Sequence, residues 1–296
     1  MGRSIGWAAP ADILRMIAVT ALGAGMTLAP RPGVAQDGSV FYTTVNGGGG
    51  NEILAIKVQG THVTTKDVGA TGLPGGNAFN GCYVLAMSKG GTLYSVCGPL
   101  FGAQQLATID LKTGHANVFG VPTPGLSVMS IAFGPDGRLY AVGDCNPDFS
   151  NPAVPACAQG NDPNFNSLYT IDVSTGAFSR IGATGAPQYF MDLAFDRQGH
   201  LFGVTTTLAP SYVPAILYRL DPATGAATKV VDLIGSSQVM GLAFDDHGKL
   251  YGTDFMGLPG LYVIDMKTGF ETAIGSLPIG LSSSLEWVGG GDNDDR

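Results

Sequence analysis

Asp192 and Glu286 are the acidic residues of this 296-residue chain whose positions best suit chemistry. Both lie in segments that repeat along the chain, and the other repeats carry small residues at the same places. The equivalents of Asp192 are Ser130, Gly241 and Ser284, and those of Glu286 are Ala132, Ala194 and Ala243. Two carboxylates in a crowded place need a cation, a network of donors or a raised pKa. They could therefore be metal ligands or an acid/base pair of a hydrolase or lyase, or members of a structural network.

A second set of oxygen ligands lies in the insertion 144–167. Asp144, Asn146 and Asp148 stand at alternate positions, as the ligands of calcium loops do. Phe149 stands where an EF-hand requires glycine, which excludes that loop type. Calcium is therefore the cofactor that the sequence offers, and a loop rich in Asn and Pro without a metal is the alternative.

Histidine and charge exclude other chemistries. The four histidines form no His-x-His or His-Glu-x-x-His pair, so a zinc site or a Ser-His-Asp triad has little support. The formal net charge is −8 and the isoelectric point is about 4.8, which leaves no basic surface for nucleic acid. Glycine is abundant, at 45 residues, and favours short strands joined by tight turns over helices.

Two repeated units organise the chain. The first reads SIAFGPDGRLYAVG at 130–143, and close copies begin at residues 192 and 241. The second reads LYTIDVSTGAFSRIG at 168–182 and contains Asp-x-x-Thr-Gly, with Asp at 110, 172, 221 and 265. Each unit is an alternating apolar run, a Gly-containing turn and a second run, which predicts a β-hairpin. We interpret the repeated Asp residues as turn formers.

The two ends of the chain together form one further copy of the first unit, and this copy indicates the number of blades. Two hairpins make a four-stranded sheet of the size of a propeller blade. The segment 284–293 fits the first strand of the first unit, and 37–45 fits its turn and second strand. The sequence therefore predicts an all-β, five-bladed β-propeller in which the N-terminal strand completes the C-terminal blade.

One face of this propeller should carry the functional loops. The loops that join strand two to strand three fall at 45–52, 98–105, 144–167, 206–216 and 254–260. These loops and a blade-to-blade link contain aromatic residues suited to sugars, peptides or apolar small molecules. Together with the two axial carboxylates, the candidate ligand-binding residues are Phe101, Tyr189, Asp192, Tyr212, Phe255 and Glu286. The alternative is that the rings only seal the mouth of the propeller.

The repeats resemble the secreted NHL-like and lactonase-like β-propellers, and this likeness covers nearly all of residues 37–290. It implies a propeller fold, while function stays open because propellers host many activities. The chain lacks the histidine on the functional face that streptogramin lyases use. It also lacks an evident set of the Glu, Asn and Asp metal ligands of gluconolactonase-like enzymes.

The first 35 residues have the layout of a secretory signal peptide. An apolar run from Met16 to Leu28 is followed by small residues before Gln36, and it is too short to span a bilayer. We therefore predict a propeller domain at 36–296 that is secreted or periplasmic.

The four cysteines fit export and predict two disulfides. If Met87 pairs with Thr92 in the hairpin, the antiparallel register also brings Cys82 opposite Cys97. Cys145 and Cys157 bracket the insertion and would close it as a loop.

The leading hypothesis is a secreted, monomeric binding module for an extracellular small molecule, glycan or peptide, with no membrane span. The alternative is a metal-assisted hydrolase or lyase that uses Asp192 and Glu286. Whether the chain is an enzyme is left open by the residues.

Overall fold

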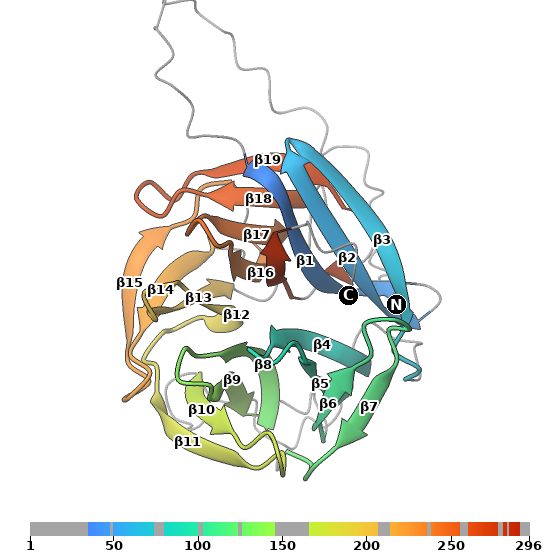
Figure 1. Ribbon diagram of the computed structural model, residues 1–296. Coiled ribbons are helices and arrows are strands. Elements are labelled where there is room, and N and C mark those ends of the chain that lie inside the picture. The colour runs from blue at the N-terminus through green and yellow to red at the C-terminus, as the bar shows by residue number, and fades with distance from the viewer. Residues whose placement is uncertain are drawn as a thin grey trace, which may run out of the picture. The chain divides into compact units, whose positions relative to one another are not determined.

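The computed structural model describes residues 35–47, 50–73, 80–99, 103–123, 126–145, 166–206, 214–235, 238–254, 260–277, 281–282 and 284–290. They belong to a unit that spans Ala35–Arg296. All regular structure in these residues is β-strand, arranged as five antiparallel sheets in a ring (Figure 1). The predicted all-β propeller with five blades is confirmed.

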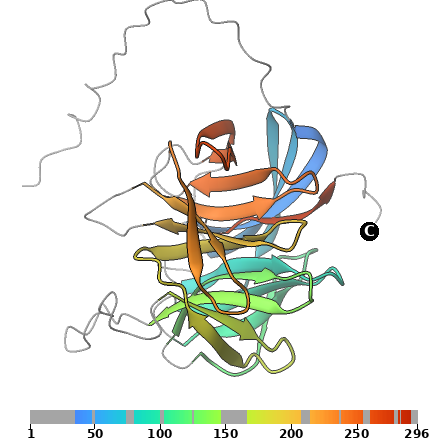
Figure 2. The same ribbon diagram turned by 90° about the vertical axis from the view of Figure 1, so that its left-hand side faces the viewer.

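Four blades are built in the same order, with the first strand innermost and the fourth outermost. Blade 1 consists of β4 (Asn80–Met87), β5 (Leu93–Pro99), β6 (Gln105–Ile109) and β7 (Ala116–Phe119). Blade 2 consists of β8 (Leu126–Phe133), β9 (Leu139–Cys145), β10 (Ser167–Ile171) and β11 (Phe178–Ala183). Blade 3 consists of β12 (Tyr189–Phe195), β13 (Leu201–Thr206), β14 (Ile216–Leu220) and β15 (Ala227–Asp232). Blade 4 consists of β16 (Val239–Phe244), β17 (Leu250–Asp254), β18 (Gly260–Ile264) and β19 (Glu271–Ser276). Figure 2 shows these blades from the side.

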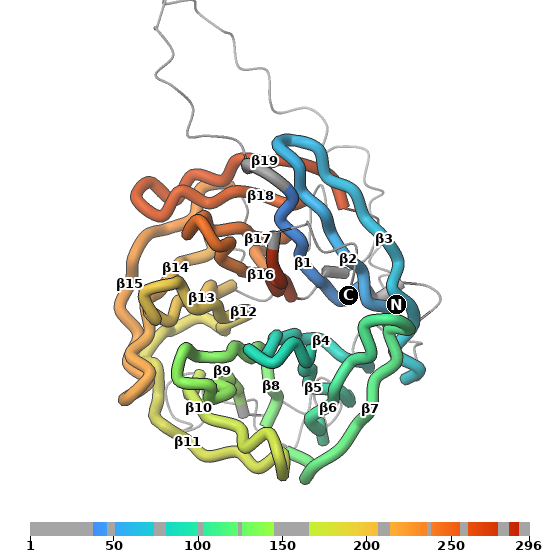
Figure 3. The backbone as a smooth tube through the Cα atoms, in the orientation of Figure 1, coloured from blue at the N-terminus to red at the C-terminus, as the bar shows by residue number. Residues whose placement is uncertain are grey.

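The fifth blade joins the two ends of the propeller. Its strands are β21 (Glu286–Gly290), β1 (Ala35–Gly47), β2 (Gly50–Gly60) and β3 (His62–Ala70), with the short β20 (Leu281–Ser282) also paired to β1. Trp287 lies opposite Phe41, and Glu286 lies opposite Tyr42. Figure 3 shows β21, in red, beside β1, in blue. The predicted closure by strands from both ends of the chain is therefore confirmed.

The fifth blade also corrects one predicted loop. The sequence placed a loop at 45–52, but β1 continues to Gly47 and β2 begins at Gly50, with Asn46 opposite Asn51. Because the two strands run on to the end of the hairpin, little of this segment remains for a binding loop. The other four connections leave the strands near the predicted positions.

The core lies between the blades. Buried aliphatic and aromatic side chains from neighbouring sheets form five clusters, one of which places Phe41 against Tyr251 of blade 4 with ring centroids 4.8 Å apart. Burial of these alternating apolar residues is the main favourable contribution to folding.

The repeated Asp-x-x-Thr-Gly turns have the structural role that the sequence predicted. Asp221 Oδ1 accepts a hydrogen bond from the Ala223 N–H at 2.9 Å, and Asp172 Oδ1 accepts one from the Ser174 N–H at 2.8 Å. Hydrogen bonds within the turns hold the pKa of both carboxyls below its usual value. The main cause at Asp172 is the hydrogen bond from the Ser174 hydroxyl, and the main cause at Asp221 is the one from the Ala223 N–H. The turns also contact the neighbouring blade. Gly225 lies in a turn of blade 3 and has φ +84°, and a Cβ atom there would lie 2.7 Å from the carbonyl oxygen of Gly182 in blade 2.

We expect Gly225→Ala to destabilise the propeller by about 2 kcal/mol or more, since it combines a left-handed backbone with a clash against another blade. Gly137→Ala is the matched control, because Gly137 has φ +78° and nothing lies within 4 Å of its would-be Cβ. Urea unfolding should show the larger loss for Gly225→Ala. Equal losses would mean that the contact between blades contributes nothing.

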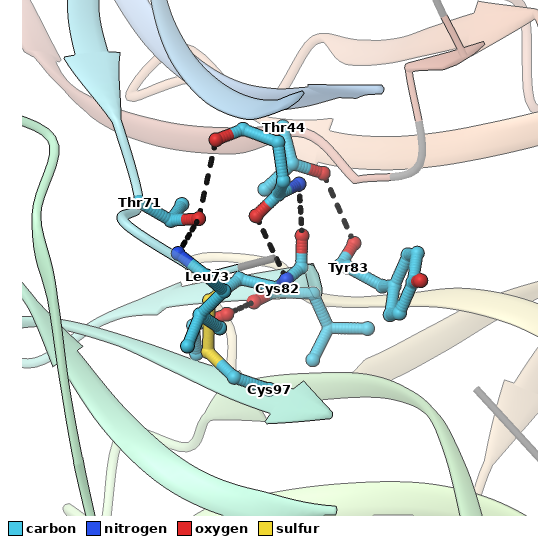
Figure 4. Close-up of a disulfide and its surroundings, with 9 residues drawn as sticks. Thr44, Thr71, Leu73, Cys82, Tyr83 and Cys97 are labelled. Atoms are coloured by element: carbon cyan, nitrogen blue, oxygen red, sulfur yellow. Dashed lines mark hydrogen bonds between the residues drawn. A yellow bond between two sulfur atoms is a disulfide. The ribbon is translucent and has the colours of Figure 1, made fainter. Parts of the chain in front are cut away.

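Cys82 and Cys97 form a buried disulfide, as predicted (Figure 4). Their Cα atoms are 4.0 Å apart. The Cys82 N–H and C=O bond to the side chain of Asn51 and not to Cys97, so this is the closer, non-hydrogen-bonded type of pair. The register that led to the prediction was wrong, because Met87 pairs with Leu93 and not with Thr92. A β-bulge between Cys82 and Val84 shifts the register by one residue and restores the cysteine pair.

Loss of this disulfide should cost about 3 kcal/mol, the chain-entropy value for a loop of this length. The bond closes a separation of 15 residues. We expect the double variant Cys82→Ala/Cys97→Ala to unfold at a clearly lower urea concentration than the wild-type chain. An unchanged midpoint would contradict a stabilising role. The predicted second bond, Cys145–Cys157, lies outside the described residues except for the backbone of Cys145 at the end of β9.

Candidate functional site

The innermost strands bring the two candidate carboxylates together near the axis of the ring. Asp192 lies in β12 of blade 3, and Glu286 lies in β21 of blade 5. The two belong to successive levels along the axis. We name the first the Asp192 layer (Val84, Ser130, Asp192, Gly241 and Ser284) and the second the Glu286 layer (Ala86, Ala132, Ala194, Ala243 and Glu286). The second lies nearer the hairpin turns between the first two strands.

Asp192 is buried, with 1% of its surface exposed, and accepts hydrogen bonds from four donors. The Leu242 N–H donates to Oδ2 at 2.7 Å and the Leu285 N–H donates to the same oxygen at 3.3 Å. The Ser130 hydroxyl donates to Oδ1 at 2.5 Å, and the Leu193 N–H also reaches Oδ1, at 3.0 Å. This carboxyl therefore joins blades 2, 3, 4 and 5.

The reach of Asp192 across two blades depends on Gly241. Elsewhere in the layer a side chain serves the following blade: Ser130 Oγ accepts the Leu193 N–H at 2.9 Å, and Ser284 Oγ accepts the Leu85 N–H at 3.1 Å. Gly241 has no side chain to offer to Leu285, and a Cβ atom there would lie 2.9 Å from the Leu285 nitrogen. Asp192 Oδ2 accepts the hydrogen bond from the Leu285 N–H instead. The layer thus satisfies N–H groups on strand edges that would otherwise be unpaired.

Burial raises the pKa of Asp192 to about 7, while the hydrogen bond from Ser130 and those from the three N–H groups oppose that rise. A raised pKa is common in catalytic carboxyls, but structural networks produce it too. Here three of the four described donors, Ser130, Leu242 and Leu285, belong to other blades, so the carboxyl connects blades. The sequence left open whether a cation, a network of donors or a raised pKa compensates for the crowding of this carboxyl. The structure shows a network of donors around Asp192 and a raised pKa.

Glu286 has a different environment. It is partly exposed, and its Oε1 accepts the Met87 N–H at 2.9 Å. Among the described residues, no hydrogen-bond donor reaches Oε2. Desolvation raises the pKa of Glu286 to about 8, and the neighbouring charge of Asp192 adds to the rise.

A small cavity of about 110 Å³ lies beside Glu286. Its walls come from the ends of four innermost strands: Ala132, Phe133, Ala194, Phe195, Ala243, Phe244, Glu286 and Trp287. The alanines of the Glu286 layer leave this space because they carry no larger side chain.

The calcium ligands predicted in the insertion are only partly described. Asp144 lies at the end of β9, opposite Ser127, and is 2% exposed. Asn146 and Asp148 lie outside the described residues, so the predicted calcium site stays a prediction.

One acidic group that the sequence did not single out as a metal site could hold an ion. Oxygen and nitrogen atoms of Asp245, Asp246 and His247 lie within 4.8 Å of one another in the first hairpin turn of blade 4. Asp245 already accepts the N–H groups of His247 and Lys249 and the hydroxyl of Tyr251. Asp246 bonds His247 Nδ1 at 2.7 Å. This geometry is that of a satisfied turn.

Of the aromatic candidates, Tyr189 is described. It is partly buried at the start of β12, opposite Thr206, and packs against the cluster that contains Met191 and Val239. Phe101, Tyr212 and Phe255 lie outside the described residues.

Amide side chains near the start of several third strands were missed by the sequence reasoning. Asn51 pairs with the backbone of Cys82, the Asn166 Oδ1 accepts the Phe190 N–H at 3.3 Å, and the Gln104 Oε1 accepts the Val128 N–H at 2.7 Å. Each fixes the first strand of the following blade. An Asn or Gln just before or within the start of the third strand, in three of five blades, was the signal that could have revealed them.

No helix in the described part of the chain has the length and hydropathy required to cross a bilayer. The sequence matches no family model and no curated protein.

Solved structures that it resembles include lactonase-like propellers, as the repeats implied. A gluconolactonase from Xanthomonas campestris is 14% identical, with a TM-score of 0.46 over 86% of this chain and 84% of that one. An inactive variant of virginiamycin B lyase from Staphylococcus aureus is 14% identical, with a TM-score of 0.38 over 69% of this chain and 72% of that one.

An aldose sugar dehydrogenase from Streptomyces coelicolor in its PQQ-bound form is 13% identical, with a TM-score of 0.43 over 86% of this chain and 82% of that one. With identities and scores of this size, these likenesses assign no activity to this chain.

Proposed function

We propose that the chain is an exported binding module that recognises a small molecule, glycan or peptide on the face that carries the loops between strands two and three. The observation that supports this most is the use of Asp192. Three of its four hydrogen bonds come from other blades, so this axial acidic residue is engaged in holding the ring together.

Recognition on this face would then depend on contact with side chains such as Tyr189, at the beginning of β12. An aromatic ring with a hydroxyl offers an apolar face for a sugar or peptide and a polar group for orientation. The buried Cys82–Cys97 disulfide supports export, because disulfides persist in oxidising compartments.

Glycan and peptide arrays and a small-molecule thermal-shift library provide the test. Each hit is measured again with Tyr189→Ala and with Phe270→Ala as the matched control. Phe270 is an aromatic residue that is 57% exposed and lies directly before the outermost strand of blade 4, β19. We expect Tyr189→Ala to weaken binding about tenfold or more, as loss of a central aromatic contact does. Phe270→Ala should leave it unchanged.

The hydrolase or lyase alternative makes the opposite prediction. If Asp192 acts on a substrate, a broad activity screen should find turnover that a folded Asp192→Asn variant loses while Tyr189→Ala retains it. That result would overturn the binding module.

A further inference from the structure

Blade 1 carries an open groove of about 810 Å³ beside the turn that joins β6 to β7. This turn connects strands three and four, so the groove lies at the end of the blade opposite the loop face. The polar side chains that line it are Thr92, Thr108, Asp110, Lys112, His115 and Asn117. The mechanism proposed for Asp192 uses none of them.

The pairing of β5, β6 and β7 places most of these side chains on one face of the sheet. Thr108 lies opposite both Tyr94 of β5 and Asn117 of β7. Residues two places further along each strand share that face, which adds Thr92 and the residues at the two ends of the turn. Tyr94 packs against Phe133 of blade 2 with ring centroids 5.4 Å apart, so the face is turned toward blade 2.

A short hairpin turn in blade 1 leaves room for the groove. The residue directly before the second strand is Thr92 in blade 1, and its equivalents in blades 2, 3 and 4 are longer basic residues: Arg138, His200 and Lys249. Gly91, which precedes Thr92, has nothing within 4 Å of a would-be Cβ atom. Blade 1 therefore has more open space beside its second turn than a long side chain would leave.

The polar groups of the groove are available to a ligand. Asp110 Oδ1 accepts the Lys112 N–H at 2.7 Å and the Thr113 N–H at 3.3 Å, but no donor among the described residues reaches Oδ2. In blade 3 the equivalent oxygen of Asp221 accepts the Thr224 hydroxyl at 2.9 Å. Within the described part of the chain, four further side chains of the groove make no hydrogen bond: Thr92, Thr108, His115 and Asn117.

We propose that this groove binds a neutral pyranose sugar through its hydroxyl groups. A sugar hydroxyl both donates and accepts, and it is matched here by the Asp110 carboxylate, the Asn117 amide and the threonine hydroxyls. The single carboxylate of Asp110 and the single ammonium of Lys112 balance each other, which favours a neutral ligand over an ion. The volume lies within the range of about 300–1,000 Å³ of small-molecule sites. This site is separate from the loop face, and it goes beyond the proposed function.

Binding is tested on the full chain with the methyl pyranosides of glucose, galactose, mannose and fucose. Saturation-transfer NMR detects the bound sugar, and amide chemical shifts of the protein locate it. We expect weak binding of at least one glycoside, accompanied by shifts of the Lys112 and Thr113 amides, because these N–H groups bond to Asp110.

Two variants of blade 1 and two elsewhere assign the site. Thr92→Arg introduces the residue type that blade 2 carries at this place and should block the groove. Asn117→Ala should weaken binding about tenfold or more. Thr228→Ala is the matched control, because Thr228 is exposed and holds the equivalent place in β15, opposite Arg219. Tyr189→Ala tests the loop face. Both of these variants should bind the sugar unchanged, with circular dichroism showing that all four fold.

Two results would overturn the proposal. One is the absence of saturation transfer and of amide shifts with every glycoside. The other is binding that persists in both Thr92→Arg and Asn117→Ala, or that is lost in Thr228→Ala or Tyr189→Ala, since either outcome would place the sugar elsewhere. Loss in Tyr189→Ala alone would support the loop face and contradict the groove.

Discussion

Replacement of Asp192 by alanine is expected to lower the free energy of unfolding by about 3 kcal/mol or more, because each buried donor left without an acceptor costs about 1–3 kcal/mol. The variant orphans the N–H groups of Leu242 and Leu285 and the hydroxyl of Ser130. For a domain of this size the melting temperature should fall by roughly 6–12 °C. Urea and thermal unfolding of the full chain measure both quantities.

Asp172→Ala is the control for this experiment. Asp172 also accepts backbone N–H groups, but it lies in an exposed turn where water can replace the lost acceptor. We expect it to cost less than about 1 kcal/mol. Similar losses for the two variants would show that Asp192 does not join the blades.

The free energy of unfolding should decrease as the pH rises from about 4 to about 8, measured with EDTA present so that no metal contributes. The pKa of Asp192 rises from 3.8 to about 7, and that of Glu286 rises from 4.5 to about 8. The folded state therefore binds more protons than the unfolded state across this interval, and deprotonation costs stability as the pH rises. Each group contributes up to about 1.4 kcal/mol per pH unit.

The exposed turn carboxyls change the free energy of unfolding in the opposite direction, and they do so at lower pH. The pKa values of Asp172, Asp221 and Asp265 lie below 3.8, so the stability that they contribute is lost as the pH falls through those values. Maximum stability should thus fall near pH 4–5, between these two effects. Urea unfolding of the wild-type chain and Glu286→Gln at several pH values tests this. The variant should lose stability less steeply from about pH 4.5 to 8 and should be nearly flat between pH 7 and 8, where Asp192 no longer contributes. Stability of the wild-type chain that rises from pH 5 to 8 would contradict the prediction.

Most of the architecture was predictable because it is repeated. Each hairpin carries its own alternating pattern and turn glycine, so five copies of each unit predicted five blades. The unit divided between 37–45 and 284–293 predicted that strands from both ends of the chain close the ring. The alignment of repeats also predicted that Asp192 and Glu286 lie on innermost strands, which they do.

What the repeats could not show is local geometry that differs between copies. A β-bulge changes the register by one residue without changing the apolar pattern, which is why the pairing of Met87 was wrong while the cysteine pair was right. The different fates of the two carboxyls depend on neighbours in other blades. Asp192 reaches Leu285 because Gly241 leaves room, and Glu286 borders a cavity because its equivalents are alanine.

The proposal of a binding module depends on a structural role for Asp192, whose hydrogen bonds connect the blades of the ring. Amide hydrogen exchange of the full chain tests this role most directly. Leu242 and Leu285 lie on open strand edges, yet their N–H groups donate to Asp192. We predict slow exchange for both in the wild-type chain and loss of that protection in Asp192→Ala. Fast exchange in the wild-type chain would mean that the Asp192 carboxyl is free of these donors and open to chemistry, which would contradict this role and favour the enzyme.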